Sequence, residues 1–202
     1  MAIAILPEDI RSSYDVYEYR HAIAILKTDF PSEYEDIIAM LRNFKLKRQD
    51  IITAGGSKSA IAASLDEFLT GNRKKKTQGR GWLEKKFETK IFIDEDEYDT
   101  PTHKIDCYKN RIGLEIEWNN KDPFFDRDLN NFRLLHERNA ISVGIIVTRC
   151  SNLQEIFDRL DKGKSYGNST THINKLLPRI DGGSGGGCPL LIFGITHALY
   201  EE

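Results

Sequence analysis

Three acidic residues in the segment 105–121 could carry out metal-assisted chemistry together. Asp106 is followed, after eight intervening residues, by Glu115 and then by Glu117. Side chains two positions apart on a strand point to the same face, so the two glutamates share one side and the apolar residues around them take the other. Carboxylates gathered in this way are typical ligands of a hard cation.

Residues 105–108 and 113–118 have the alternation of two strands, with a short polar turn between them. If they pair as a hairpin, Asp106 lies beside Glu115, and three carboxylates then come close together. That arrangement is costly unless a cation or a proton relieves the repulsion, so we expect a Mg²⁺ site. A strand with one wet face has the same alternation and is the alternative. The basic and amide residues around the hairpin suit a polyanion and favour the metal site.

This pattern resembles the active-site segment of the PD-(D/E)XK nucleases, and more narrowly the restriction endonucleases of the BglII, BstYI and BamHI group. The resemblance covers roughly residues 55–196. Beyond the acidic segment it is carried by 119–124, by a helix containing His136, and by apolar runs at 142–148 and 189–195.

The resemblance implies roles for the individual residues. Asp106 and Glu115 would hold Mg²⁺ with help from the backbone carbonyl of Ile116. The family usually has a lysine where this chain has Glu117, so the general base is open: Glu117 itself, or a metal-bound water that it orients. The fold implied is α/β, a restriction-endonuclease-like core with a mixed central β-sheet flanked by helices.

The function implied is that of a type II restriction endonuclease, which hydrolyses double-stranded DNA at a short palindromic site. The resemblance further implies a homodimer, a cognate DNA methyltransferase in the host, and a recognition site with a GATC core. Two alternatives remain open: a repair or resolving nuclease on the same core, and a non-catalytic DNA-binding module.

Two polar segments and one basic run are candidates for DNA contacts. The polar loop 161–171 could contact bases, since asparagine suits adenine in the major groove. The alternative is a plain helix-capping loop, which would have the same composition. Lysines in a run could bind phosphates or simply be solvated. The candidate residues are Asn119, Asn120, Lys121, Ser165, Tyr166, Asn168, Ser169, Thr170, Thr171, Lys74, Lys75 and Lys76.

The helix expected at 126–139 carries the apolar stripe Leu129, Phe132 and Leu135. Because the resembled enzymes form twofold dimers through helices of this region, the stripe is a candidate dimer interface. The alternative is that it packs against the sheet of its own chain.

The remaining elements follow from periodicity and from turn residues. We expect one or two strands in the first 30 residues, including 22–26, and a helical turn at 82 that leads into a strand at 87–93. Glu84 and Glu88 could join the active site. Further expected features are helices at 32–44, 60–69 (capped by Ser57 or Ser59), 153–160 and 172–177, strands at 141–147 and 189–195, an acidic turn at 94–99 and a flexible segment at 181–187.

Composition fits one domain over residues 1–202, of which 40% are hydrophobic. The net charge of −2 argues against a passive DNA coat protein but leaves a nuclease with one basic cleft open. Three cysteines without paired spacing predict reduced thiols and a cytoplasmic location. No apolar run reaches the about 20 residues of a membrane helix, and no membrane partner is expected.

Overall fold

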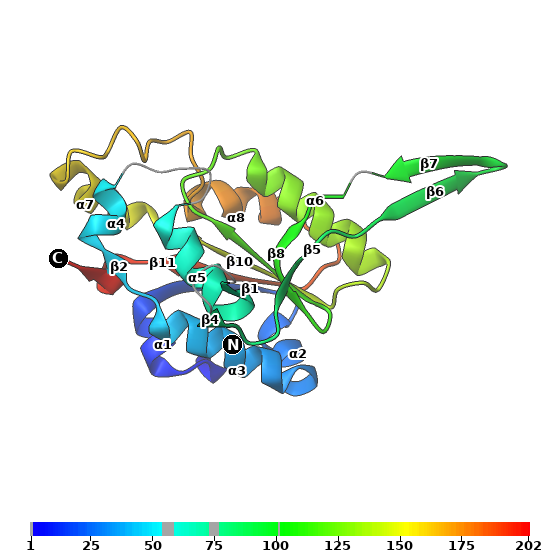
Figure 1. Cartoon of the computed structure of the whole chain (residues 1–202), viewed down its shortest axis with the longest axis horizontal. Coiled ribbons are helices and arrows are strands. Elements are labelled where there is room, and N and C mark those ends of the chain that lie inside the picture. Colours follow the sequence, from blue (N-terminus) through cyan, green and yellow to red (C-terminus); the bar gives the residue numbers. More distant parts are fainter. Residues whose placement is uncertain (1, 54–58, 73–76, 101) are drawn as a thin grey trace.

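A six-stranded mixed sheet forms the centre of the molecule (Figure 1). The computed structural model describes residues 2–53, 59–72, 77–100 and 102–202. The strand order is β1-β11-β10-β9-β8-β5; β9, β10 and β11 are parallel to one another, and the other pairings are antiparallel. The strands are β1 Tyr14–Tyr19, β5 Leu83–Lys85, β8 Ile105–Lys109, β9 Ile112–Glu117, β10 Val143–Arg149 and β11 Leu190–Ile195.

Helices cover both faces of this sheet, because its strands alternate apolar side chains toward two separate core clusters. One cluster joins Val147 and Phe193 to α1 Glu8–Ser13, α2 Ala22–Asp29, α3 Pro31–Asn43 and α5 Ala60–Thr70. The other joins Ile146 and Ile192 to α6 Phe124–Glu137 and α8 Ile173–Asp181. The predicted α/β architecture with a mixed sheet flanked by helices is confirmed.

Short elements complete the described chain. They are η1 Ala2–Ile5, β2 Leu46–Lys47, α4 Arg48–Ile52, β3 Gly71–Asn72, β4 Thr77–Gln78, η2 Ser151–Leu153, α7 Gln154–Arg159, η3 His197–Leu199 and β12 Tyr200–Glu201.

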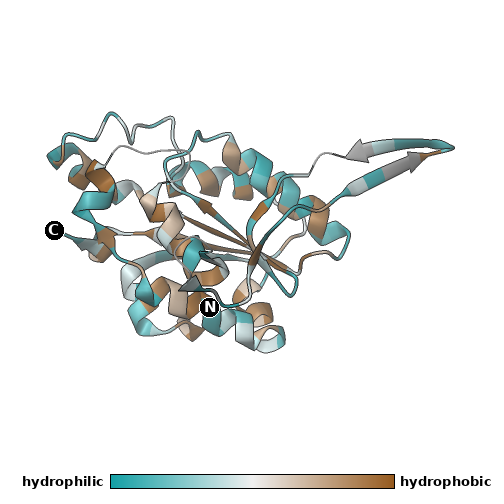
Figure 2. Ribbon diagram, viewed as in Figure 1, coloured by the Kyte–Doolittle hydropathy of each residue, from teal (hydrophilic) through white to brown (hydrophobic). Residues whose placement is uncertain are grey.

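A hairpin arm made of β6 Thr89–Ile93 and β7 Asp96–Thr100 projects from the body (Figures 1 and 2). The turn predicted at 94–99 is therefore shorter than expected, because the residues after Glu95 form the returning strand. The helical turn predicted at 82 is wrong as well. Trp82 instead lies outside any helix, just before β5, and its indole Nε1 donates to the Asp36 Oδ2 at 3.0 Å.

The second strand predicted near the N-terminus is also wrong, because residues 22–26 begin the helix α2. Ala22, Ile23 and Leu26 are fully buried at helical spacing, and Arg20 and His21 turn the chain with φ of 56° and 60°. The predicted helices at 32–44 and 60–69 are confirmed as α3 and α5. Ser59 caps α5, its Oγ accepting from the Ala62 amide at 3.0 Å; Ser57 lies outside the described residues.

The glycine-rich segment 181–187, predicted to be flexible, follows the end of α8 with a series of turns that lead to β11; most of its residues are exposed, and Gly185 is buried. A Cβ at Gly185 would lie 2.6 Å from Leu190 Cδ1, and one at Gly186, which has φ of +56°, would lie 2.5 Å from Arg133 Cγ. A Cβ at either position would require the Leu190 or Arg133 side chain to shift, so these two glycines allow a close approach; the flexibility of the segment stays a prediction.

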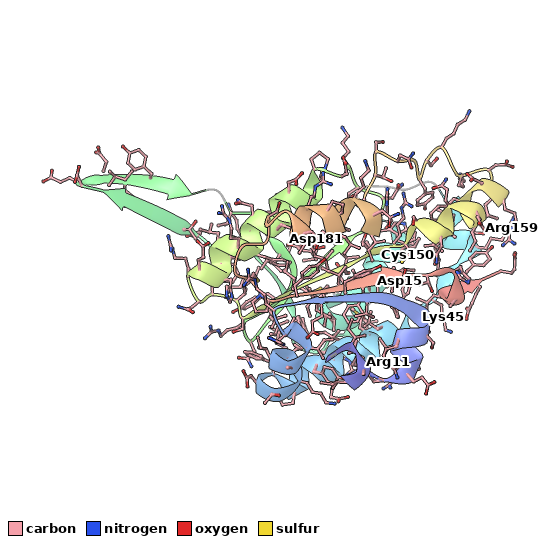
Figure 3. All side chains as sticks on the ribbon, turned by 180° about the vertical axis from the view of Figure 1, so that it is seen from behind. Arg11, Asp15, Lys45, Cys150, Arg159 and Asp181 are labelled. Atoms are coloured by element: carbon pink, nitrogen blue, oxygen red, sulfur yellow. The ribbon has the colours of Figure 1, made fainter. Side chains whose placement is uncertain are left out.

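None of the three cysteines is paired in a disulfide, as predicted, and all three are buried. Cys150, next to Asp15 in Figure 3, donates through Sγ to the Asp15 Oδ2 at 3.0 Å. In the part of the chain that the structure describes, no helix is long and apolar enough to cross a membrane.

Candidate active site

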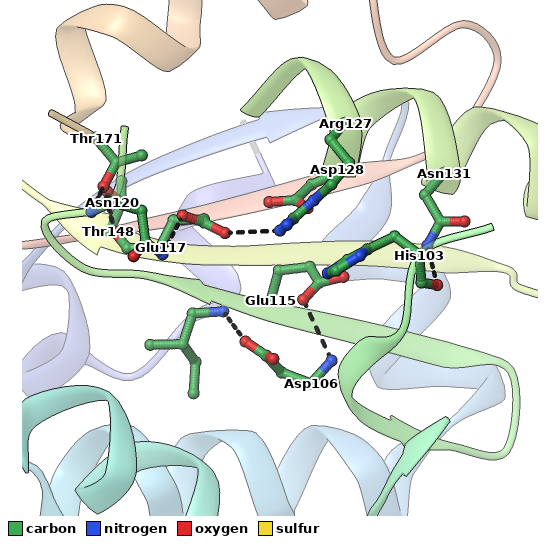
Figure 4. Close-up of polar contacts among 11 residues, drawn as sticks. His103, Asp106, Glu115, Glu117, Asn120, Arg127, Asp128, Asn131, Thr148 and Thr171 are labelled. Carbon is green, nitrogen blue, oxygen red and sulfur yellow. Dashed lines mark hydrogen bonds and ion pairs between the residues drawn. The ribbon is translucent and has the colours of Figure 1, made fainter. Parts of the chain in front are cut away.

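The hairpin of β8 and β9 places Asp106 beside Glu115 as predicted. Its turn residues Asn110 and Arg111 have positive φ of 42° and 71°, and the register pairs Cys107 with Leu114. The Asp106 amide donates to Glu115 Oε2 at 3.2 Å. In return, the Asp106 Oδ2 accepts from the amide of the residue after Glu115 at 3.1 Å (Figure 4).

Glu117 lies on the same face of β9, and a fourth acid joins the cluster from the opposite side. Asp128 on α6 is fully buried, and Glu115 and Glu117 are only 1% and 2% exposed. Asp128 is not among the site residues predicted from the sequence. A signal was present, because Asp128 and Asn131 stand three positions apart beside an apolar helical stripe, which puts both polar side chains toward the sheet.

Burial and mutual repulsion disturb the ionisation of three of these carboxyls. Burial, followed by repulsion from Asp128 and Asp106, raises the pKa of Glu115 well above its usual range. Burial and the neighbouring Asp128 raise the pKa of Glu117 to about 9. Burial also raises the pKa of Asp128, although Glu117 and Arg127 oppose that change. The cluster therefore holds more carboxylates than its own cations neutralise.

Two side chains hold Glu117 from its polar end. Asn120 donates through Nδ2 to Glu117 Oε2 at 2.7 Å. Arg127 donates through Nη2 to Glu117 Oε1 at 3.3 Å and to Asp128 Oδ1 at 2.8 Å. The guanidinium also lies over the Phe124 ring, 4.2 Å from its centroid. These donors fix the direction of the Glu117 carboxylate. Its neighbours Glu115 and Asp128 each keep one oxygen that accepts no hydrogen bond.

The chemistry of this cluster fits a hard divalent cation. Glu115 Oε1 and Asp128 Oδ2 are buried without a hydrogen-bond partner, and oxygen atoms are the ligands that Mg²⁺ prefers. Among the described residues, however, no group of three or more His, Cys, Asp or Glu side chains has the geometry of a metal site as it stands. One oxygen each of Asp106 and Glu115 accepts a hydrogen bond across the hairpin, which leaves their second oxygens for a cation.

The two polar segments predicted to contact DNA lie next to each other at the end of β9. Lys121 and Thr170 form an antiparallel bridge, and the Thr171 amide donates to the Asn120 carbonyl at 2.8 Å. The Thr171 hydroxyl donates to the Glu117 carbonyl at 3.2 Å. The loop 161–171 is therefore tied directly to the strand that carries the acids.

Within these segments the side chains divide by exposure. Tyr166 is 7% exposed and Thr171 is fully buried, so the prediction that their side chains contact DNA is wrong: packing and hydrogen bonds inside the chain use them. Half-buried or exposed side chains are those of Asn119, Asn120, Lys121, Ser165, Asn168, Ser169 and Thr170. Lys74, Lys75 and Lys76 lie outside the described residues.

The stripe Leu129, Phe132 and Leu135 is not a dimer surface. Its side chains are at most 1% exposed in the single chain and belong to the core cluster between α6 and the sheet. The alternative interpretation, packing within the chain, is correct.

Of the upstream acids, Glu84 pairs with Lys104 at 3.1 Å, and its side chain is 60% exposed; Glu88 is exposed.

Comparison with known proteins gives one family. A family model described as Endonuc-BglII, restriction endonuclease BglII/BglIII, matches residues 14–195. The matched range begins at the first residue of β1 and ends at the last residue of β11, so it spans the whole central sheet and all four acids. No curated protein matches the chain.

Proposed function

This chain belongs to the BglII/BglIII restriction endonuclease family, and on that premise we propose that it is a Mg²⁺-dependent type II enzyme. Restriction endonucleases are hydrolases that cut DNA. The proposal is that this one hydrolyses one phosphodiester per subunit of a homodimer, at a short palindromic site in double-stranded DNA. A GATC core within that site and a methyltransferase that protects the host belong to the same proposal.

The observation that carries the proposal is the surplus of buried carboxyls. Asp106, Glu115 and the backbone carbonyl of Ile116 would hold Mg²⁺, since these groups offer oxygen ligands at one end of the hairpin. The bound cation would supply positive charge to the scissile phosphate and to the charge that develops on it. A cation held there would also favour the ionised carboxylates, since burial and then mutual repulsion raise the pKa of Glu115 and Glu117 without it.

Glu117 is the candidate for activating the attacking water. Asn120 and Arg127 each donate to one of its carboxylate oxygens, which fixes its orientation for proton transfer. With a pKa of about 9 in the metal-free chain, Glu117 is mostly protonated near neutral pH, so it could accept a proton only once a nearby cation had lowered that pKa. Glu117 would therefore either take the proton of the water or orient that water.

Recognition would come from the paired segments after β9 and in the loop 161–171. The side chains available for base or phosphate contacts are Asn119, Lys121, Ser165, Asn168, Ser169 and Thr170. Asn120 is also available, although it serves Glu117 at the same time. Because the stripe on α6 is buried, the twofold partner would have to use other surfaces.

The test is incubation of the purified protein with plasmid and phage DNA in Mg²⁺ or in EDTA, together with two matched variants. Asp106→Asn removes a carboxylate of the cluster, and Glu8→Gln removes an exposed carboxylate on α1. We expect a discrete set of fragments with the native protein and with Glu8→Gln in Mg²⁺. Neither EDTA nor Asp106→Asn should yield any.

The fragment ends would give the recognition site and show whether it is palindromic. A Mg²⁺-dependent smear, or nicking alone, would instead indicate a repair or resolving nuclease on the same core. DNA binding that Mg²⁺ does not affect, with no cleavage of DNAs of varied sequence, would indicate a non-catalytic binding module. Cleavage that survives Asp106→Asn would remove the carboxylate cluster from the mechanism.

A further inference from the structure

Arg149, the last residue of β10, is a buried cation outside the carboxylate cluster. Its side chain is among the largest that are fully buried, at 1% exposure. No ion pair is found for it in the described ranges, and its Nε has no hydrogen-bond partner there. An arginine held in this way is costly to bury, so its position calls for an explanation.

The guanidinium of Arg149 is directed at the loop 161–171. Its Nη2 donates to the Tyr166 carbonyl at 2.8 Å and to the Thr170 hydroxyl at 2.9 Å, and it lies 3.5 Å from the Gly167 carbonyl. Burial lowers the pKa of Arg149 to about 10, so the group stays charged near neutral pH. One cation thus holds both ends of the four-residue turn 167–170.

Aromatic packing fixes the base of the same turn. Tyr166 stacks on Phe157 with centroids 4.1 Å apart and planes at 15°, and it meets Trp118 edge-on at 5.9 Å. Trp118 directly follows Glu117, so the loop rests on the continuation of the catalytic strand. Between the fixed ends, Asn168 and Ser169 are exposed.

We propose that Arg149 is a positioning residue for sequence recognition: it holds the turn 167–170 so that Asn168 and Ser169 meet base edges in one geometry. This inference rests on the proposed function, because it assumes that the chain reads DNA sequence. All three contacts come from one nitrogen, Nη2; the planar guanidinium holds that nitrogen in a fixed direction, whereas the ammonium of lysine sits on a flexible stem. Base contacts depend on such geometry, whereas phosphate contacts tolerate its loss. Removing Arg149 should therefore reduce discrimination between sequences more than it reduces affinity for DNA in general.

The experiment is a binding selection from randomised DNA duplexes, with Ca²⁺ in place of Mg²⁺ so that bound DNA is recovered and sequenced. The proteins compared are the native chain, Arg149→Met, Arg149→Lys and a control, Ile145→Val, which changes a buried side chain of the same strand. We expect the native chain and the control to enrich one short motif. Enrichment by Arg149→Met should fall by about tenfold or more, the range of a lost bidentate base contact, while its binding to the unselected pool stays within about threefold. Arg149→Lys should lie closer to Met than to the native chain.

Thr170→Val, which removes one acceptor of Arg149 at the half-buried end of the loop, replaces Arg149→Met if that variant does not fold. It should lower the enrichment by about threefold. Undiminished enrichment of the motif by a folded Arg149→Met, or by Thr170→Val, overturns the role of Arg149 and leaves the nuclease proposal standing. Enrichment of no motif by a native chain that also cleaves nothing overturns both.

Discussion

Two buried acidic sites lie at opposite ends of the β8–β9 hairpin, and they are built in opposite ways. At the turn end, Asp36 from α3 accepts from Lys109 Nζ at 2.8 Å, Trp82 Nε1 at 3.0 Å and Arg80 Nη1 at 3.2 Å. Burial would raise the pKa of Asp36, but these hydrogen bonds outweigh burial and lower it. At the other end, Glu115 has one donor for its carboxylate, the Asp106 amide, and its pKa is raised.

The difference separates a structural site from a site kept ready for a ligand. A fully partnered buried carboxylate stabilises the fold in its ionised form, whereas a carboxylate surrounded by other acids destabilises it. Proteins tolerate the second arrangement mainly at functional sites, where another group completes the neutralisation. Exchanging a carboxylate for an amide should therefore change the free energy of unfolding in opposite directions at the two ends of the hairpin.

The largest effect should follow from Glu115→Gln. Cleavage in Mg²⁺ should fall by about a thousandfold or more, equivalent to about 4 kcal/mol of transition-state stabilisation, since an oxygen ligand with charge is lost. The free energy of unfolding in EDTA at pH 8 should rise by about 1 kcal/mol, because a buried ionisable group has been replaced by a neutral one. Single-turnover cleavage and urea unfolding would measure the two changes.

The same exchange at Asp36 should act on stability alone. Asp36→Asn removes the anion of Arg80 and leaves Lys109 only the more distant Glu33 carboxylate, at 3.9 Å. We expect the free energy of unfolding to fall by about 2 kcal/mol, a value discounted because the Arg80 side chain is 44% exposed. Cleavage by the folded variant should stay within about threefold of the native rate. If Asp36→Asn abolished cleavage in the folded state, or if Glu115→Gln destabilised the protein, the contrast between the two sites would not hold.

The two ends of the hairpin should also respond to pH in different windows. A carboxyl whose pKa is raised by folding stabilises the fold fully only below its ordinary pKa, which is 4.5 for Glu117. That contribution is lost as the pH rises through the folded pKa, which is about 9 for Glu117. In EDTA, the thermal midpoint should therefore fall between about pH 5 and pH 9. Mg²⁺ should remove much of the fall, and Glu117→Gln should flatten it in EDTA. Asp36, whose pKa is lowered, loses its contribution only on acidification below its ordinary 3.8.

Differential scanning fluorimetry at constant ionic strength, with Ca²⁺ and Mg²⁺ compared, would measure this dependence. A midpoint that rises steadily from pH 5 to pH 9 in EDTA would show that the carboxyls of the cluster are not the groups that titrate.

The sequence predicted the hairpin well because its information is local. Alternation with a period of two, interrupted at Asn110 and Arg111, determines both the turn and the pairing of Asp106 with Glu115. The strand predicted at 22–26 is wrong because this segment lacks such an alternation. A short run made only of apolar residues has no distinguishable period, and the buried positions Ala22, Ile23 and Leu26 follow a helix only because α2 packs on the sheet.

Contacts between distant segments were beyond such patterns. Asp128 reaches Glu117 only because α6 folds back over the face of β9. Tyr166 is buried only because Phe157 and Trp118 close around it. A polar loop therefore looked like a uniform recognition surface, although its side chains divide between the core and solvent.

The smallest effect we predict concerns Arg127, the only cation of the described site that touches the cluster. Its Nη2 lies 3.3 Å from Glu117 Oε1, and its charge lowers the pKa values of Glu117 and Asp128. Arg127→Gln should raise both, so the acidic limb of the pH profile for cleavage should move up by about half a pH unit, a modest value because the Arg127 side chain is 33% exposed. Rates at saturating DNA report the bound enzyme and exclude any loss of affinity. Arg133→Gln, on the exposed side of the same helix and bonded to Asn130, should leave the limb in place. A limb that shifts to lower pH in Arg127→Gln would mean that another group controls the rate.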